Sequence, residues 1–176
     1  MKKNCLKLVP VSEDDAEFIF EMMQDKKYQE HYLERLIPKN LNEAKNSVKK
    51  SIKEMEKKFA YNFILKEGKT KIGVIDIYKI MQKDKRCSIG YGIKRDYWRK
   101  GYGTIACKLG ANFIKTKLKL HSIEATAEPN NKASCRVLEK NGFRKIGVIE
   151  DYYLNKGKYV NRVLYWKILE EKKNEF

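Results

Sequence analysis

The segment from residue 87 to residue 127 constrains the fold of this chain more than any other part of its sequence. Residues 87–93 alternate apolar side chains with small ones and predict a β-strand. A glycine-bearing turn follows, then an amphipathic helix over 104–117 and a second short apolar strand over 123–127. A strand, a crossover helix and a second strand form a right-handed unit with parallel strands. The chain is therefore expected to be an α/β (α+β) protein with a parallel strand pair.

The turn between the first strand and the helix has the chemistry of an anion site. It contains Gly101-Tyr102-Gly103-Thr104, and glycines allow the backbone to turn sharply and to approach a ligand closely. The first N–H groups of a helix have no partner within the helix, and the helix dipole adds partial positive charge there. A phosphate or pyrophosphate group is the expected ligand, although two glycines are also common in an ordinary turn.

The remaining sequence predicts further strands and helices on both sides of this unit. Ser12 is expected to cap a first helix and Asn42 a second one that runs to residue 58. A short helix before Asn141-Gly142 is expected to end there in the usual C-terminal manner. The predicted outer strands cover residues 6–11, 59–66, 71–80, 143–153 and 159–169. The sequence shows no repeat or linker, so residues 1–176 are expected to form one domain, with a frayed tail at 170–176.

Composition indicates a globular protein outside the membrane. Of the 176 residues, 42% are hydrophobic and 35% are charged, which is typical of chains that form a packed core. No apolar run approaches the roughly 20 residues that a membrane span requires. The amino-terminal residues lack the apolar core of a signal peptide, so the cytoplasm is the expected location.

The cysteines and histidines give no metal-binding pattern. Cys5, Cys87, Cys107 and Cys135 form no Cys-x-x-Cys pair, and the chain has only two histidines. We expect free, mostly buried thiols and no metal site.

The net charge of the chain is strongly positive. It is +16, from 39 Lys and Arg residues against 23 Asp and Glu residues. Such a charge favours anionic partners such as RNA, a ribosomal surface or coenzyme A, although a solvated lysine-rich surface explains it equally well.

Two motifs together make the chain resemble the GNAT acetyltransferases, and within them the RimJ/RimL-like branch of ribosomal-protein N-terminal and polyamine acetyltransferases. The first is the loop Trp98-Arg-Lys-Gly101-Tyr-Gly103, which resembles the family's Gln/Arg-x-x-Gly-x-Gly/Ala loop with Trp in the first position. The second is Asn131-Lys-Ala-Ser134, followed by Glu139-Lys-Asn-Gly-Phe143. The order of elements fits over most of residues 5–168. The resemblance implies one mixed, mostly antiparallel sheet of six or seven strands with a splayed parallel pair and flanking helices.

The same resemblance implies acetyl-CoA as co-substrate, with no metal. The loop amides would bind the CoA pyrophosphate, the preceding strand would pair with the pantetheine and supply an oxyanion donor, and Asn131 would contact the cofactor. The residues implied in cofactor binding are Tyr91, Gly92, Ile93, Trp98, Arg99, Lys100, Gly101, Tyr102, Gly103, Thr104 and Asn131. Tight packing against a helix is the alternative reason for the glycines, and helix capping is a compatible second role for Asn131.

The catalytic residues implied are Ser134 and Glu124. Polyamine-type members of the family have a tyrosine where this chain has Leu138, so Ser134 is expected to protonate the leaving thiolate, as in ribosomal-protein-type members. Glu124 is the first choice for the base, with Asp76, Glu150 and Asp151 in reserve, unless solvent takes the proton. In the family, the segment that holds His31 and Tyr32 covers the acceptor groove. His31, Tyr32 and Asp76 are therefore candidate substrate contacts.

A protein N-terminal amine is the expected acceptor, because the missing tyrosine and the positive charge both disfavour a polyamine. A small-molecule amine such as a polyamine, an aminoglycoside or an amino-acid derivative stays open, and an acidic pocket would overcome the charge argument. A basic RNA-binding protein and a CoA sensor without turnover are the non-enzymatic alternatives. Family members are often dimers, so a homodimer is also among the expectations.

Overall fold

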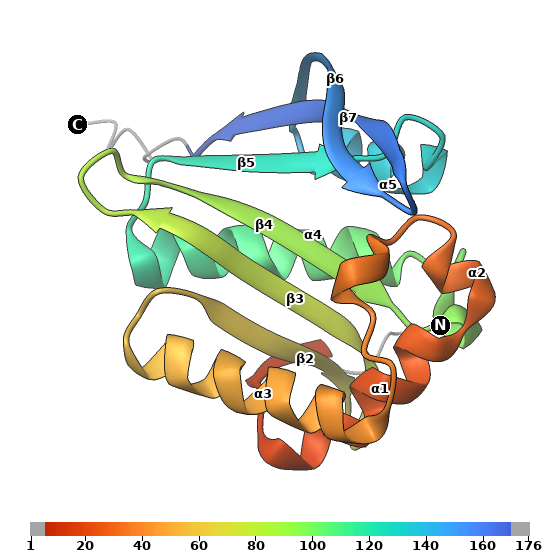
Figure 1. Ribbon diagram of the computed structural model, residues 1–176. Coiled ribbons are helices and arrows are strands. Elements are labelled where there is room, and N and C mark those ends of the chain that lie inside the picture. The colour runs from red at the N-terminus through yellow and green to blue at the C-terminus, as the bar shows by residue number, and fades with distance from the viewer. Residues whose placement is uncertain (1–5, 170–176) are drawn as a thin grey trace.

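A computed structural model describes residues 6–169, which fold around a seven-stranded mixed sheet (Figure 1). The strand order is β1-β2-β3-β4-β5-β7-β6, and every neighbouring pair is antiparallel except β4 and β5. This confirms the expected mixed sheet with one parallel pair. The strands are β1 (Leu6–Pro10), β2 (Tyr61–Glu67), β3 (Thr70–Met81), β4 (Arg86–Ile93), β5 (Ser122–Ala127), β6 (Arg144–Asn155) and β7 (Lys158–Ile168).

Helices cover both faces of the sheet. Helices α1 (Ala16–Gln24), α2 (Lys26–Gln29) and α3 (Leu41–Glu56) lie on one face, and α4 (Tyr102–Phe113) and α5 (Lys132–Lys140) lie on the other (Figure 1). We call these the α1–α3 face and the α4–α5 face. A π-helical turn (Ile114–Leu118) extends α4, and 3₁₀ turns occupy Glu13–Asp15, Glu34–Leu36 and Arg95–Tyr97.

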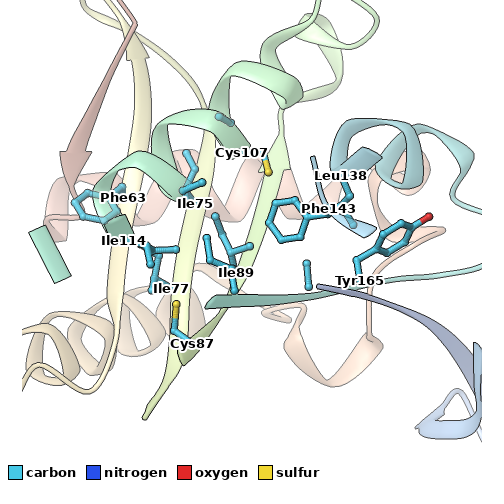
Figure 2. Close-up of a cluster of buried hydrophobic side chains, with 14 of the residues drawn as sticks. Phe63, Ile75, Ile77, Cys87, Ile89, Cys107, Ile114, Leu138, Phe143 and Tyr165 are labelled. Atoms are coloured by element: carbon cyan, nitrogen blue, oxygen red, sulfur yellow. The ribbon is translucent and has the colours of Figure 1, made fainter. Parts of the chain in front are cut away.

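The larger apolar core lies between the sheet and α4. Ile75 and Ile77 from β3 and Ile89 from β4 face Cys107 and Ile114 of the helical layer, as Figure 2 shows. Because side chains alternate along a strand, the strand residues between these core positions point to the α1–α3 face. A smaller cluster that includes Met22, Tyr28, Val48, Ile64 and Val74 fills that face. Alternation therefore sorts the polar strand residues Asp76, Ser88 and Glu124 onto the α1–α3 face.

Local signals set most element ends, and one predicted cap is wrong. Helix α3 is capped by the Asn40 side chain, which accepts from the Glu43 amide at 2.9 Å, and not by Asn42. Asn42 lies inside the helix because the backbone is already helical from Leu41. The predicted end at Asn141-Gly142 is confirmed: Gly142 has a φ of +74°, and the Phe143 amide donates to the Leu138 carbonyl.

The entry into α1 is held by a buried carboxylate, and its loss should weaken the fold in a pH-dependent way. Asp15 is 1% exposed, lies 2.6 Å from Lys71 Nζ, and accepts from the amide and hydroxyl of Ser12. Burial alone would raise the pKa of Asp15, but the bonds from Lys71 and Ser12 outweigh it and hold the pKa below its usual value. The charged form is therefore stabilised by folding.

We expect Asp15→Asn to lower the free energy of unfolding by about 2 kcal/mol at pH 7, the range for hydrogen bonds to charged groups. A lowered folded-state pKa stabilises the protein above the unfolded-state pKa of about 3.9, and this stabilisation is lost as the pH falls through the folded-state pKa. Urea unfolding should thus show a difference in the free energy of unfolding between wild type and variant, and this difference should become smaller below about pH 4. Glu13→Gln, at an exposed neighbouring carboxylate, is the control. An equal gap at pH 3 and pH 7 would contradict this role.

Candidate active site

The parallel strands β4 and β5 separate after a short paired segment. They pair only at Arg86↔Ser122, Cys87↔Ile123 and Ser88↔Glu124, although β4 continues to Ile93 and β5 to Ala127. Beyond Ser88, the edge of β4 toward β5 therefore has no strand partner. Unpaired backbone groups in the middle of a sheet are costly unless another partner binds them. The gap can accept a ligand with amide groups along an edge of about 17 Å, the rise of five residues from Ser88 to Ile93.

The open end of this gap leads directly to the anion loop. Gly101 is the N-terminal cap residue of α4, and its φ of +80° and the φ of +58° at Arg99 turn the loop tightly. The first helical amide bond of α4 runs from Ile105 to the Gly101 carbonyl, so the amides of the preceding first turn have no partner within the helix. A twelve-residue helix adds its dipole at this point. The loop therefore fits the phosphates of coenzyme A.

The side chains of the loop mostly hold its shape. Trp98 Nε1 donates to the Ile93 carbonyl at 2.7 Å, which ties the loop to the end of β4. Lys100 Nζ donates to the Asp96 carbonyl at 2.8 Å, and the Tyr102 hydroxyl donates to Glu67 at 2.7 Å. Arg99 forms no ion pair with any of residues 6–169, so its charge is available to an anion.

Close packing explains two of the glycines. A Cβ on Gly92 would lie 2.0 Å from the Tyr28 hydroxyl oxygen, so α2 can rest on β4 only because residue 92 has no side chain. A Cβ on Gly103 would lie 3.3 Å from Val137, which sets the close approach of α4 to α5. The packing interpretation of these glycines is compatible with cofactor binding, since both bring backbone near the gap.

Ser134 lies over the gap on the α4–α5 face, next to a second hydroxyl. Asn131 caps α5, and its side-chain oxygen accepts from the Ser134 amide at 3.0 Å. The Ser134 hydroxyl lies 3.2 Å from the hydroxyl of Tyr91 on β4, and the Tyr91 hydroxyl also lies within donating distance, 3.2 Å, of the Ser134 carbonyl, so α5 is hydrogen-bonded to β4 at this point. Burial raises the pKa of Tyr91 well above its ordinary value, which keeps the phenol protonated.

Glu124 lies at the narrow end of the gap, on the opposite face. It is half-buried in the last paired position, and the Ser88 hydroxyl donates to its Oε1 at 3.4 Å. Its other oxygen has no hydrogen bond from residues 6–169. The carboxylate is thus held at one oxygen and free at the other.

Asp76 and Tyr32 lie together on the same α1–α3 face. Asn62 Nδ2 donates to Asp76 Oδ1 at 2.7 Å, and burial raises the pKa of Asp76. Burial also raises the pKa of Tyr32, and the nearby Asp76 carboxylate raises it further. Tyr28 packs against Tyr32 with ring centroids 5.3 Å apart. These two predicted acceptor contacts therefore share one partly polar patch.

His31 lies elsewhere, at the end of β5. Its Nδ1 is 2.7 Å from Oε2 of Glu128. The Glu34 amide donates to the Asn155 side chain at 2.9 Å, and the Asn155 amide group donates to the Tyr32 carbonyl at 3.4 Å. The segment that follows α2 thus spans the splayed strands and rests on the β6–β7 hairpin (Figure 1).

The reserve carboxylates Glu150 and Asp151 are not brought to the gap. Both are exposed on the edge strand β6, which β7 separates from β5. In contrast, sequence reasoning missed the Tyr91 side chain, Glu128 and Arg162. Arg162 had a signal: like Asp76, it is a charge inside an otherwise apolar strand. The positions of Tyr91 and Glu128 become meaningful only through contacts with distant parts of the chain.

Within residues 6–169, no helix is both long enough and apolar enough to span a membrane. The same residues contain no group of three or more His, Cys, Asp or Glu side chains that could hold a metal ion.

Comparison with known proteins gives the family. The model of the acetyltransferase (GNAT) domain matches residues 6–144. A relative from Bacillus licheniformis, described as the uncharacterized N-acetyltransferase p20, is 34% identical over 101 residues. That match covers 57% of each chain, so it spans little more than half the length of the relative.

Solved structures of several acetyltransferases have the same fold. Mycobacterium smegmatis RimJ in complex with CoA-disulfide has a TM-score of 0.89 at 21% identity, covering 97% of this chain and 85% of its own. Ribosomal-protein-S5-alanine acetyltransferase from Vibrio fischeri has a TM-score of 0.81 at 20% identity, with 96% and 95% covered. Spermidine N-acetyltransferase from Vibrio cholerae, in complex with CoA and spermine, has a TM-score of 0.82 at 17% identity. That match covers 93% of this chain and 95% of the Vibrio cholerae chain. The match to the domain model confirms the predicted resemblance and the enzyme class it implies: the chain belongs to the GNAT family of N-acetyltransferases.

Proposed function

We propose that this protein transfers the acetyl group of acetyl-CoA to a primary amine, and that the amine is the N-terminus of a protein. The single observation that supports this best is the arrangement around the splayed strands. A pair of hydroxyl groups, Ser134 and Tyr91, lies on one face, and a carboxylate, Glu124, lies on the other. Transfer to an amine needs a proton acceptor on the side of the amine and a proton donor on the side of the sulfur.

The loop and the strand edge are suited to hold the co-substrate. When bound, acetyl-CoA supplies an activated thioester carbonyl, and its sulfur leaves as a thiol once a proton reaches it. The amides at the start of α4 and the charge of Arg99 would bind the phosphates. The unpaired edge of β4 from Tyr91 to Ile93 would bind the pantetheine amides and provide an N–H group for the oxyanion.

Glu124 is proposed as the base that removes the proton from the amine. Glu124 lies on the α1–α3 face, and the bond from Ser88 holds one of its oxygens and leaves the other open to an amine. A base must come within about 3 Å of the nitrogen to act, which Glu124 can do only for an amine at the narrow end of the gap. Asp76 stays the reserve base: Asn62 binds one of its oxygens, burial raises its pKa, and it lies on β3, farther from the splayed strand pair than Glu124.

Ser134 is proposed to give its proton to the sulfur. The proton that leaves Ser134 Oγ would be replaced from the Tyr91 hydroxyl, which lies 3.2 Å from both the Oγ and the carbonyl oxygen of Ser134 and can turn from the carbonyl to the Oγ, and then from solvent. The Asn131 cap holds the Ser134 backbone, and the cap does not depend on the serine hydroxyl. Ser134 is thus a positioned proton donor, and Tyr91 can return a proton to it.

A polyamine acceptor is the second candidate, and a specific observation favours it. Glu124 and Glu128 both lie on the acceptor side and would attract a polycation. The tyrosine of polyamine-type members is absent, because position 138 is a buried leucine. The two acceptor classes can be separated only by experiment.

We also propose the cellular compartment and the partners of the reaction. The thiols of Cys87, Cys107 and Cys135 are free, which suits a reducing compartment such as the cytoplasm. The charge of +16 would favour an acceptor presented on the ribosome or near other RNA. The homodimer stays a prediction.

Calorimetric titration with acetyl-CoA, followed by a thiol-release assay, tests the proposed function. The acceptors are a panel of N-terminal peptides, spermidine and spermine. We expect binding of acetyl-CoA and thiol release with one or more of the peptides. Release with spermidine alone would support the second candidate, and binding without release would indicate a CoA sensor. Salt-dependent RNA binding without acetyl-CoA binding would overturn the proposal in favour of an RNA-binding protein.

A further inference from the structure

Arg162 on β7 is a buried cation that the proposed catalytic steps do not use. It is 6% exposed, and its only hydrogen bond within residues 6–169 runs from Nη1 to the Asn161 carbonyl at 3.2 Å. A guanidinium group has five N–H donors in a fixed fork, and the Asn161 carbonyl is the acceptor for only one of them here. No carboxylate of the described residues forms an ion pair with it. A buried arginine with unused donors therefore points to a ligand that supplies the acceptors.

The guanidinium group of Arg35 lies near the same tyrosine ring as that of Arg162. The Tyr153 ring lies 5.3 Å from Cζ of Arg162 and 4.9 Å from Cζ of Arg35. Arg35 is exposed on the 3₁₀ turn Glu34–Leu36, and its Nη1 also donates to the Leu154 carbonyl at 3.2 Å. Burial lowers the pKa of Arg162, and the proximity of Arg35 lowers it further, so the two charges repel each other. An anion bound to both guanidinium groups would offset that repulsion.

The Glu128 carboxylate does not fill this role. The Glu128 carboxylate lies close enough to favour the charged form of Arg162, but its Oε2 is bound to His31 at 2.7 Å. The carboxylate that acts on Arg162 is therefore already engaged by His31.

Strand register places these arginines relative to the proposed transfer site. The pairs Glu124↔Trp166, Thr126↔Leu164 and Ala127↔Val163 put Arg162 opposite position 128, four residues along β5 from Glu124. Arg162, Leu164 and Trp166 alternate with the core residues Val163 and Tyr165, so they share the acceptor face with Glu124. Four strand residues span about 13 Å. An extended acceptor with its amine at Glu124 would reach the arginines with its second to fourth residue.

We infer that Arg162 and Arg35 bind a carboxylate of the acceptor, so that the protein acetylates N-terminal peptides with an acidic residue at position 2, 3 or 4. The inference rests on the proposed function and narrows its substrate class. A free amino acid carries its carboxylate beside the amine and cannot span the distance. A polyamine would bring further positive charge toward two arginines, so polyamines are disfavoured at this end of the site.

The first test uses the wild-type protein and matched hexapeptides with free N-termini. One set carries Asp at position 2, 3 or 4 in turn, and parallel sets carry Asn or Lys there. We expect at least one Asp peptide to exceed its Asn counterpart by about tenfold in kcat/KM, and its Lys counterpart by more, because each charge-assisted contact is worth about that factor. Free aspartate should be a poor acceptor. Transfer to peptides at equal rates would overturn this inference and leave the proposed function intact, whereas no transfer to any peptide would overturn both.

The second test changes Arg35, which is exposed and can be replaced with little risk to folding. Arg35→Glu should reverse the preference from the Asp to the Lys peptide, mainly through KM, whereas a merely structural arginine would lower both rates alike. Arg162→Lys keeps the charge but loses the fork, and should reduce the Asp preference with kcat nearly unchanged. Arg144→Gln, at an exposed arginine of β6, is the control and should leave the preference as it is. An unaltered Asp preference in both Arg35→Glu and Arg162→Lys would rule these residues out as the carboxylate site.

Discussion

Replacing Glu124 with glutamine should lower kcat for amine acetylation by about 10²- to 10⁴-fold, the range for a positioned general base. Glutamine keeps the size of the side chain and can still accept the bond that Ser88 donates at 3.4 Å. It cannot take up a proton from the amine. The variant should therefore bind acetyl-CoA normally, which calorimetry can check, and fail at transfer.

The split between kcat and KM adds a test that a structural role would not pass. In Glu124→Gln, kcat should fall while KM for acetyl-CoA stays near the wild-type value, because the amide fills the same space but cannot accept a proton. Glu150→Gln, at an exposed carboxylate on the edge strand, is the matched control. Full activity in Glu124→Gln would show that the amine loses its proton to solvent or to another group, and Asp76→Asn would then be the next variant to measure.

Elements that depend on short-range chemistry could be predicted from the sequence. The Gly101 turn, the Asn141-Gly142 helix end and the hairpin at Lys156-Gly157 all need residues that tolerate positive φ, and the structure has positive φ at these turns. Strand alternation likewise predicted which segments form the sheet. The prediction of Asn42 as a helix cap was wrong. Asn40, two residues earlier, can form the same capping hydrogen bond, and local sequence does not decide between the two asparagines.

The parts of the site that could not be predicted depend on contacts between distant segments. The bond between His31 and Glu128 joins residues 97 positions apart, and the bond from Glu34 to Asn155 joins residues 121 apart. The irregular pairing of β6 between Ile149 and Tyr153 displaces Tyr153 from a regular ladder, and the ring then lies near Arg162. Periodicity in a single strand carries no information about such pairs. The resemblance to a family predicted which loop binds the cofactor and left the acceptor side open.

Ser134→Ala should reduce kcat by about 10²-fold, and Tyr91→Phe by about tenfold, if the two hydroxyls deliver one proton to the leaving sulfur in sequence. Ser134→Ala removes only the hydroxyl, because the Asn131 cap binds the backbone amide of residue 134 and survives the change. Tyr91→Phe keeps the ring in the core and removes the group 3.2 Å from Ser134 Oγ. Ser47→Ala and Tyr159→Phe, at exposed positions, are the matched controls and should leave kcat unchanged.

The double variant distinguishes a relay from two independent donors. In a relay, Tyr91 acts only through Ser134, so Ser134→Ala with Tyr91→Phe should be as slow as Ser134→Ala alone. Independent donors would give losses that multiply. Because burial raises the pKa of Tyr91, the tyrosine should stay protonated throughout the assay range, and the wild type should show no loss of activity at alkaline pH from this group. Wild-type kcat in Ser134→Ala would contradict the assignment and place the proton donor with Tyr91 or with water in the gap.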